Sequence, residues 1–425
     1  MTIAELQQRV PELLAEHRLP GMAVGICDAS SVLWADGFGL TRAGGLPITT
    51  DTIFSVQSCS KMYTAMAVLR GVEDGLVELD EPIPRYLPDF RVHSSFEDRP
   101  ERLITLRHLL GHTAGFTHEA PVGSNYLVGS ESFQAHCESI SDTWLRFPVG
   151  QRYEYSNLGI DLAGYILQRR SGLPFHEFVR RQVLEPLGLS RTTFDARVIR
   201  RDAGRAIGHS AGYSRLPVRV PMVAAGGLYT NVDDACRFMQ FHLRDDGALA
   251  EMYAGTEYGL GIALRRAHGI PVRGHGGGGF GFLSDMYWAP QHGIGVVVLT
   301  NSTDHPLPWT FASDIFRDLL GEDAVQDDPP PARPVDELPE RVPAAPDGPW
   351  NRDYAIHVSG VRDGTARLRK ENGVLMFDHW IGGTVRLHEH LPGLYISSTG
   401  ETLDLTRTPP TYANVRLYEL SERGA

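Results

Sequence analysis

A proline-rich segment divides this 425-residue chain into two parts that have to fold separately. Eight prolines occur between Asp327 and Pro349. Because each proline fixes φ and removes a backbone N–H donor, this stretch cannot belong to a packed helix or sheet. We therefore expect a stiff linker at residues 327–349, a large domain at residues 1–326 and a small domain at residues 350–425.

The large part combines helical and strand patterns. Some segments carry apolar residues at helical spacing, and others are short apolar runs bounded by turn residues. Helices are predicted at 4–17, 58–72, 158–172 and 309–320, and strands at 22–27, 31–35, 282–288 and 295–300. This order indicates an α+β fold, in which an antiparallel sheet is flanked by helices and carries a helical insertion.

The part after the linker has a different pattern. Short strand-like runs at 365–369, 374–377, 393–397 and 415–420 are separated by turns that contain Gly and Asn. Short strands with such turns are typical of an antiparallel arrangement. The sequence therefore predicts a small antiparallel β domain at the C-terminal end.

Composition excludes several classes of protein. The formal net charge of −12 argues against a nucleic-acid partner, which requires a basic surface. Apolar runs such as 295–299 are far shorter than the roughly 20 residues that span a bilayer. The chain shows no signal-peptide pattern at its start, and its four cysteines are widely spaced. These features predict a soluble, cytoplasmic protein without a membrane partner.

Two rival serine nucleophiles are present. Residues 208–212 read GHSAG, the GxSxG pattern of a nucleophile elbow centred on Ser210, and residues 275–278 read HGGG. An elbow requires a buried strand directly before the serine and a helix directly after it. Here residues 200–205 are strongly charged, and Pro217 interrupts the residues that follow. The local sequence therefore disfavours Ser210.

The second nucleophile is Ser58, in the SxxK pattern Ser58-Cys59-Ser60-Lys61. At a helix start, side chains three residues apart lie on one face, about one turn from each other. A lysine that is desolvated there can lose its proton near neutral pH and serve as base to the serine. An arginine could not do so, and Lys61 is one of only two lysines in the chain.

Two further motifs follow Ser58 and Lys61 in a fixed order. Tyr155-Ser156-Asn157 forms a YxN triplet, and His275-Gly276-Gly277 forms an HxG triplet further downstream. With this order, the chain resembles the serine β-lactamase and penicillin-binding-protein superfamily, specifically its class C-like esterase and D-aminopeptidase branch. The resemblance covers most of residues 5–320 and includes landmark segments at 104–115, 148–150, 186–189, 225–228 and 274–282.

The resemblance implies a role for each motif residue. Ser58 would be the nucleophile that forms an acyl-enzyme, and Lys61 would take its proton. Tyr155 would act as a second proton shuttle, helped if neighbouring cations lower its pKa. Asn157 would orient the Lys61 ammonium and hydrogen-bond the amide of the substrate.

The glycine-rich third motif would complete the substrate-binding site with Gly277 and Gly278. The backbone N–H groups of Ser58 and Gly278 would form an oxyanion hole for the charge that develops in the tetrahedral state. His275 stands where the β-lactamases have the lysine of a KTG motif, a cation for the substrate carboxylate. This departure points away from β-lactam turnover and toward esters, amides or small peptides.

The resemblance thus implies a serine acyl hydrolase for small ester, amide or peptide substrates, D-aminoacyl compounds included. Its site would lie between the α+β domain and the helical insertion. The C-terminal part would be the small lipocalin-like barrel that often follows this domain. His388 and His390 lack further ligands, so we expect neither a metal nor a cofactor.

Two alternatives stay open at this point. The site could pass its acyl group to an amine, as a penicillin-binding-protein-type thioesterase or acyltransferase does in peptide cyclisation. The chain could also be a non-catalytic, penicillin-binding-like sensor. The sequence makes no prediction of the oligomeric state.

Overall fold

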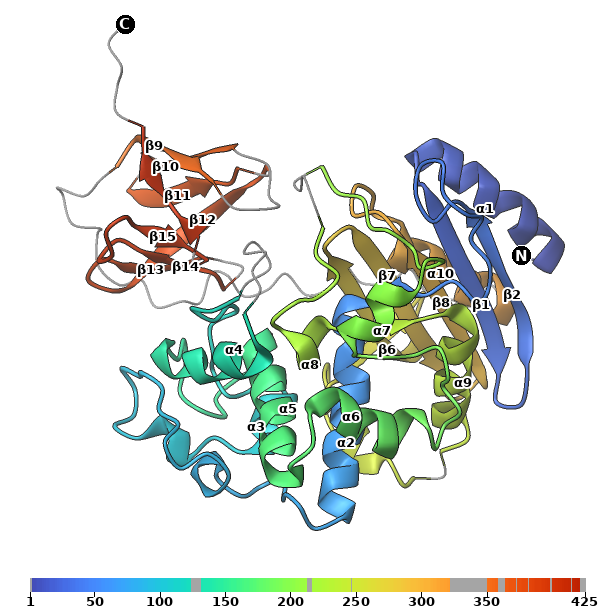
Figure 1. Ribbon diagram of the computed structural model, residues 1–425, viewed down its shortest axis with the longest axis horizontal. Helices are drawn as coiled ribbons and strands as arrows, with labels where there is room; N and C mark the ends of the chain where they lie inside the picture. The colour runs from blue at the N-terminus through green and yellow to red at the C-terminus, as the bar shows by residue number, and fades with distance from the viewer. Residues whose placement is uncertain are drawn as a thin grey trace, which may run out of the picture.

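The computed structural model describes residues 2–123, 131–211, 216–245, 247–321, 350–357, 364–371, 373–380, 382–397, 400–413 and 415–420. Residues 2–321, which we call the N-terminal unit, contain a sheet and many helices, and residues 350–420, the C-terminal barrel, contain only strands (Figure 1). The predicted linker at 327–349 lies outside the described residues, so the domain boundaries on either side of it stay a prediction.

A six-stranded antiparallel sheet forms the frame of the N-terminal unit, in the order β2-β1-β8-β7-β6-β5. Strands β1, β7 and β8 are buried along almost their whole length, which indicates that both faces of the sheet are covered. The strands are β1 (Gly21–Asp28), β2 (Val32–Gly39), β5 (Ala263–Ala267), β6 (Ile270–Gly279), β7 (Phe282–Ala289) and β8 (Ile294–Thr300).

Helices cover this sheet on both faces (Figure 1). On one face, α1 (Ile3–His17) and α10 (Leu307–Leu320) bury Leu6, Val10 and Phe311 in a core shared with alternate residues of the strands. On the other face, α9 (Val232–Leu243) packs on β1 and β8, and α2 (Ser60–Glu73) belongs to the same larger core. The predicted α+β class with helices flanking an antiparallel sheet is confirmed.

The helical insertion packs around α5 (Asn157–Ser171). The first eleven residues of α5, Asn157 to Leu167, are buried all round, and α5 contacts α2, α3, α4, α6 and α8. The other insertion elements are β3 (Phe54–Ser55), α3 (Leu106–Leu110), α4 (Phe133–Ser139), α6 (Phe175–Val179), a π-turn (Arg180–Leu184), α7 (Ala196–Arg201), α8 (Val223–Gly226) and β4 (Tyr229–Thr230). Short 3₁₀ turns occur at Gln57–Cys59, Ile83–Arg85, Pro100–Arg102, Ile140–Asp142 and Ala250–Tyr253.

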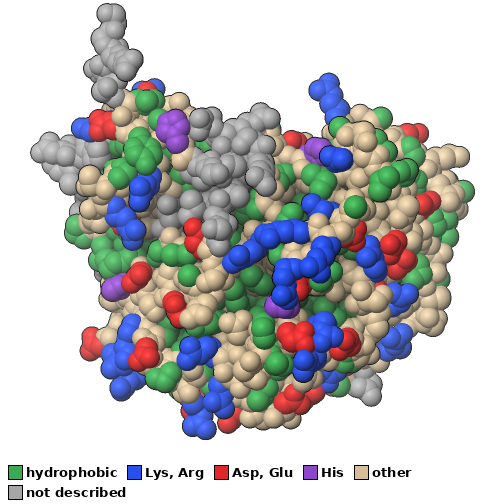
Figure 2. Space-filling model, in the orientation of Figure 1, with side chains coloured by type: hydrophobic (Ala, Val, Ile, Leu, Met, Phe, Trp, Pro, Cys, Tyr) green, Lys and Arg blue, Asp and Glu red, His purple; other side chains and the backbone are tan. Residues whose placement is uncertain are grey.

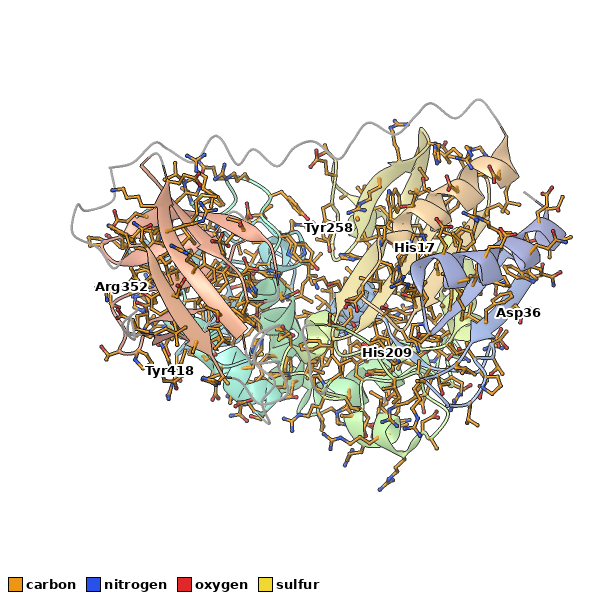
Figure 3. The ribbon with its side chains drawn as sticks, turned by 90° about the horizontal axis from the view of Figure 1, so that it is seen from above. His17, Asp36, His209, Tyr258, Arg352 and Tyr418 are labelled. Carbon is orange, nitrogen blue, oxygen red and sulfur yellow. The ribbon has the colours of Figure 1, made fainter. Side chains whose placement is uncertain are left out.

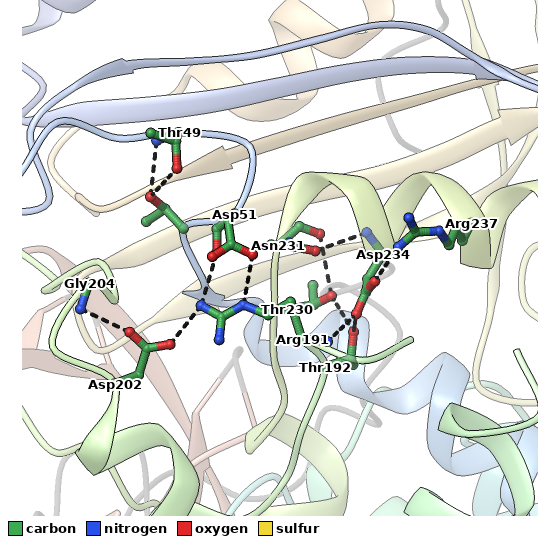
Figure 4. A network of polar contacts seen from close by, with 11 residues as sticks. Thr49, Asp51, Arg191, Thr192, Asp202, Gly204, Thr230, Asn231, Asp234 and Arg237 are labelled. Atoms are coloured by element: carbon green, nitrogen blue, oxygen red, sulfur yellow. Dashed lines mark hydrogen bonds and ion pairs between the residues drawn. The ribbon is translucent and has the colours of Figure 1, made fainter. Parts of the chain in front are cut away.

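A polar network fixes the segment that carries α7 (Figure 4). The Arg191 guanidinium lies 2.9 Å from the Asp51 carboxylate and 2.7 Å from that of Asp202. The Arg191 backbone N–H and the Thr192 hydroxyl both donate to Asp234 Oδ2 at the start of α9, at 2.7 and 2.8 Å. Residues on both sides of α7 are therefore held to the rest of the N-terminal unit.

The C-terminal barrel is a nine-stranded antiparallel sheet that nearly closes on itself, in the order β16-β15-β14-β13-β12-β11-β10-β9-β17. Its end strands β16 and β17 are separated in sequence by Leu417 alone, so the sheet has to curl until its two edges meet. The strands are β9 (Arg352–Ile356), β10 (Gly364–Glu371), β11 (Val374–Asp378), β12 (Thr384–Leu391), β13 (Leu394–Ser397), β14 (Thr402–Asp404), β15 (Thr411–Tyr412), β16 (Val415–Arg416) and β17 (Tyr418–Glu419).

The strand predicted at 415–420 is corrected by this topology. Leu417 is fully buried and divides the run into two short strands, whose residues pair with opposite edges of the sheet. Its N–H donates to the Pro410 carbonyl instead of to a neighbouring strand of either edge. The sequence pattern cannot reveal this change of partner strand, because a single strand that pairs with one neighbour throughout would show the same alternation.

The described residues of the barrel contact the insertion (Figure 3). The His118 backbone N–H donates to the Gly400 carbonyl at 3.0 Å, and the His390 ring lies 6.4 Å from that of Trp144. Figure 3 shows Arg352 and Tyr418 on the side of the barrel that faces away from the six-stranded sheet. Among the described residues, none of the helices has the length and apolar character needed to cross a membrane.

Candidate active site

Ser58 and Lys61 lie at the junction between a short 3₁₀ turn and helix α2. The turn at Gln57–Cys59 runs directly into α2, which brings the two side chains together on one face. The Lys61 Nζ lies 3.0 Å from Ser58 Oγ and donates to the Ala225 carbonyl at 2.9 Å. Burial lowers the pKa of Lys61 to about 7, against a smaller opposing effect of the Asp161 carboxylate. The amine can therefore be neutral and accept a proton near neutral pH.

Hydrogen bonds hold the turn that carries Ser58 against strands β6 and β7. The Ser284 hydroxyl donates to the Val56 carbonyl at 2.9 Å, and the Cys59 thiol donates to the His275 carbonyl at 3.0 Å. A Cβ on Gly277 would lie only 2.1 Å from the Val56 carbonyl oxygen. The second glycine of the HxG motif is therefore needed so that β6 can approach the nucleophile turn closely.

Tyr155 is the second neighbour of the nucleophile. Its hydroxyl donates to Ser58 Oγ at 2.8 Å, and its ring centroid lies 4.9 Å from Lys61 Nζ. The condition that nearby cations lower its pKa is not met, because burial of the side chain raises the pKa of Tyr155 well above its ordinary range. In the resting site Tyr155 is thus a protonated phenol, and Lys61 is the group able to act as base.

His112 holds the loop that carries Tyr155. It has a positive φ of 57°, and its Nδ1 accepts from the Ser156 N–H at 3.3 Å. The Ser156 hydroxyl donates to the Thr117 carbonyl at 2.6 Å. Desolvation lowers the pKa of His112 well below its ordinary value, so the ring is neutral. This explains the landmark segment at 104–115: its histidine positions the YxN motif.

Asp161 is a member of the site that the sequence analysis missed. It is fully buried, and its Oδ1 accepts from the N–H groups of Ala224 and Ala225 at 2.9 and 3.0 Å. Because the Ala225 carbonyl accepts from Lys61 Nζ, Asp161 fixes the partner of the base. A signal was present: Asp161 is an acidic residue, four positions after Asn157, in an otherwise apolar stretch of α5.

His275 cannot supply the cation that the KTG lysine supplies in β-lactamases. Burial lowers its pKa to about 3. Its Nδ1 faces the Gly276 carbonyl and its Nε2 accepts from the Tyr258 hydroxyl at 2.9 Å, so both ring nitrogens are engaged. A neutral, buried imidazole orders Tyr258 and β6 but offers no charge to a substrate carboxylate. The replacement of the KTG lysine by His275 therefore removes a positive charge from the site and does not exchange one cation for another.

A cavity of about 150 Å³ opens beside Ser58. Of the residues predicted from the sequence, Tyr155, Asn157 and Gly278 line it together with Ser58, whereas Lys61, Gly277 and His275 do not. With the described residues, Lys61 Nζ bonds to Ser58 Oγ and to the Ala225 carbonyl, so the expected role of Asn157 in orienting Lys61 stays a prediction. Ala225 and Gly226 of the landmark segment 225–228 also line the cavity, as do four residues that the sequence analysis did not single out: Gln57, His118, Val220 and Met222.

Ser210 does not stand at an elbow. The residues that precede it, 202–209, form a loop after α7 instead of a strand. Gly212 lies outside the described residues. The cavity beside Ser58 is lined from β6, from α5 and the loop that precedes it, from the segment around α8 and from the loop that carries His118, and Ser210 does not line it.

Comparison with known proteins agrees with this geometry. The family model described as Beta-lactamase matches residues 6–312, and the chain belongs to this family. Penicillin-binding protein 4 of Amycolatopsis lactamdurans is 28% identical over 79% of this chain and 96% of its own length. Esterase EstB of Burkholderia gladioli is 28% identical over 68% of this chain and 82% of its own. The protein is therefore an enzyme, a serine hydrolase related to the β-lactamases.

Solved structures share the fold. A structure of SurE with D-Leu has a TM-score of 0.63 at 22% identity and covers 98% of this chain and 99% of its own. The D-amino acid amidase from Ochrobactrum anthropi SV3, complexed with D-phenylalanine, has a TM-score of 0.58 at 23% identity over 70% of this chain and 92% of its own. The first of these matches extends over both the N-terminal unit and the C-terminal barrel.

Proposed function

We propose that this enzyme cleaves ester or amide bonds of small substrates through an acyl-enzyme on Ser58, with Lys61 and Tyr155 as its proton-transfer groups. The observation that carries the proposal is the position of Ser58 Oγ, 3.0 Å from Lys61 Nζ and 2.8 Å from the Tyr155 hydroxyl, at the edge of a cavity. The similarity to an esterase and to a D-amino acid amidase supports ester and D-aminoacyl amide substrates.

The proposed reaction begins with neutral Lys61. The amine takes the Ser58 proton while Oγ forms a bond to the substrate carbonyl carbon. The N–H groups of Ser58 and Gly278 hold the developing oxyanion. Tyr155, a protonated phenol, relays a proton from the Lys61 ammonium to the leaving group as its bond to carbon breaks. Water then attacks the acyl carbon while Lys61 takes the water proton; the bond to Ser58 Oγ breaks as the Lys61 ammonium returns that proton to Oγ, which releases the acid product and restores neutral Lys61.

Covalent labelling with a fluorophosphonate tests the nucleophile. The adduct is mapped by mass spectrometry in the wild type and in the variants Ser58→Ala, Lys61→Ala and Ser210→Ala. We expect a label on Ser58 that requires Lys61 and survives Ser210→Ala. A label on Ser210, or the absence of any label, contradicts the proposal. Products formed from an ester in the presence of an added amine then distinguish hydrolysis from acyl transfer.

A further inference from the structure

A second cavity lies beside the active-site cavity, and the proposed reaction does not use it. Its volume is about 270 Å³, and Val220 lines both cavities. Gly226 faces the first cavity and the next residue, Gly227, faces the second. The two cavities are therefore adjacent, with the buried Val220 at the boundary between them. We call the second cavity the arginine pocket, because Arg197, Arg200 and Arg219 line it.

The floor of the arginine pocket is apolar. Phe175 is buried at its centre, with its ring centroid 5.7 Å from that of Phe133 and 5.2 Å from that of Phe194. Val223 and Ile199 extend the same surface. An alkyl or aromatic group placed here would leave water for an apolar surround, which favours binding.

The rim of the pocket carries positive charge that is only partly neutralised. Arg197 is paired with Asp195, its Nη2 lying 2.8 Å from Oδ2. Arg219 donates to the Glu131 backbone carbonyl, which carries no charge. Among the described residues, Arg200 makes neither an ion pair nor a hydrogen bond. Within the described part of the chain, two guanidinium charges therefore remain without a carboxylate partner, in a pocket whose lining also includes Asp195, His176 and Gln168.

This concentration of positive charge is unusual for the molecule. The chain has a formal net charge of −12, yet Figure 2 shows Lys and Arg side chains gathered in a band over α7, with hydrophobic side chains in the hollow beside it. Arginine forks bind carboxylates through two parallel hydrogen bonds. The apolar floor and the cationic rim together fit a ligand with an apolar body and an anionic end.

Two of the pocket arginines lie on a helix that is held in place by polar contacts. Arg197 and Arg200 belong to α7, whose first turn is capped by the Asp195 side chain. The Arg191 network described above ties the residues before and after α7 to α9 and to Asp51. A rigid support lowers the entropic cost of binding, because the cationic groups do not have to be ordered by the ligand.

We propose that the arginine pocket is a substrate subsite for an apolar segment that ends in a carboxylate. This proposal rests on the proposed function, since it assigns the substrate class of the same active site. A carboxylate held here lies at a fixed distance from Ser58. The enzyme should therefore prefer substrates in which a particular chain length separates the carboxylate from the scissile ester.

Matched ester substrates test the subsite. One series consists of mono-p-nitrophenyl esters of α,ω-dicarboxylic acids of increasing length, and a second places the carboxylate on the alcohol side. Each compound is paired with its neutral methyl-ester analogue. In one of the two series, we expect kcat/KM to favour the anionic compound by about tenfold or more at an optimum length, as charge-assisted hydrogen bonds allow.

Variants of the arginines distinguish binding of a carboxylate in the pocket from a general effect of the charge of the molecule. Arg200→Gln, alone and with Arg219→Gln, should bring the preference for the anionic compound toward unity while kcat/KM for the neutral compound is retained. Arg201→Gln is the matched control. Arg201 is exposed on the same helix and does not line the pocket, and its substitution removes the same charge. Its preference should equal that of the wild type. An equal loss in Arg200→Gln and Arg201→Gln would overturn the proposal.

Failure of the subsite and failure of the proposed function give different results. Hydrolysis of neutral esters without a carboxylate preference in either series contradicts the subsite alone. If no ester is hydrolysed and Ser58 is not labelled, the proposed function fails. The pocket is then tested by calorimetric titration of octanedioate monoesters into the full chain carrying Ser58→Ala. Binding that Arg200→Gln weakens and Arg201→Gln does not supports the pocket, whereas no binding, or equal binding to all variants, overturns it.

Discussion

Lys61 is a buried amine whose environment opposes its charge. Desolvation is the largest influence on its pKa, and it outweighs the attraction of the Asp161 carboxylate. The resulting pKa of about 7 divides the population near neutral pH between ammonium and amine. Because only the amine can take the Ser58 proton, the titration of this single side chain should govern acylation.

The first prediction concerns pH. The kcat/KM of ester hydrolysis should rise with pH through about 7 and level off above it, because deprotonation of Lys61 creates the base. Lys61→Arg should lower kcat/KM by about 10²–10⁴-fold, because arginine does not deprotonate in proteins. A pH–rate profile of the wild type and single-turnover acylation of the variant measure both. A flat profile between pH 5 and pH 9 would contradict the role of Lys61.

The second prediction concerns Asp161. In Asp161→Asn the amide oxygen can still accept from Ala224 and Ala225, but the negative charge is lost. Since that charge raises the pKa of Lys61, the acid limb of the pH–rate profile should move to lower pH. In Asp89→Asn, the same change at an exposed carboxylate, the limb should stay in place. An unchanged limb in Asp161→Asn would show that Asp161 acts on stability alone.

Asp161→Ala adds a measurement of the structural part of this role. The truncation leaves two buried N–H groups without their acceptor, which should lower the free energy of unfolding by about 3 kcal/mol. It should also lower kcat, because the Ala225 carbonyl that accepts from Lys61 is no longer held. Denaturant unfolding and steady-state kinetics measure the two effects separately.

At the scale of elements, strand β6 determines where the nucleophile turn can lie. Its glycine-rich part, Gly276–Gly279, pairs with β7 along its whole length. The absence of a side chain on Gly277 leaves the space occupied by the Val56 carbonyl. A run of glycines has low strand propensity, so packing against the nucleophile turn and pairing with β7 impose the strand here.

The third prediction concerns this close approach. Gly277→Ala should displace the nucleophile turn from β6, because the added Cβ would lie 2.1 Å from the Val56 carbonyl oxygen. We expect labelling of Ser58 to be lost and the free energy of unfolding to fall by about 1–3 kcal/mol. The control is Gly204→Ala, where the nearest atom to a Cβ is Asp202 Oδ1 at 3.4 Å. Full activity in Gly277→Ala would contradict the role assigned to this glycine.

At the scale of the whole molecule, the C-terminal barrel reaches the wall of the active-site cavity. His118 lines that cavity, and its backbone N–H donates to the Gly400 carbonyl of the barrel. Gly400 has a φ of 97°, and a Cβ there would lie 3.1 Å from both His118 Cβ and Arg146 Nη1. The barrel therefore contributes to the shape of the substrate site, although none of its described residues lines the cavity beside Ser58.

The fourth prediction tests this contact in the full chain. Gly400→Val should push the barrel away from His118 and raise KM for a hydrolysed ester about threefold to tenfold, as loss of one hydrogen bond allows. Gly373→Val is the control: its φ of 82° gives similar strain within the barrel, and no atom lies within 4 Å of its Cβ. Equal KM values for the two variants would show that the barrel contact does not shape the site.

The sequence determined those parts of this protein that depend on local pattern. Helical spacing predicted α1, α5 and α10, and apolar runs predicted β1, β7 and β8, because these elements bury one stripe or one whole run against a single core. The predicted α2 begins two residues later than expected, since the residues before it form the 3₁₀ turn that carries Ser58. The spacing of Ser58 and Lys61 likewise follows from the geometry of one helical turn.

Only the tertiary structure decided how distant segments act on one another. The link from Asp161 through Ala225 to Lys61 joins three separate stretches of chain, and burial rather than residue type makes His275 neutral and raises the pKa of Tyr155. The arginine pocket and the contact of Gly400 with His118 also arise only when segments far apart in sequence meet. Desolvation and hydrogen bonding depend on the complete surroundings of a group, and a linear pattern contains only its neighbours along the chain.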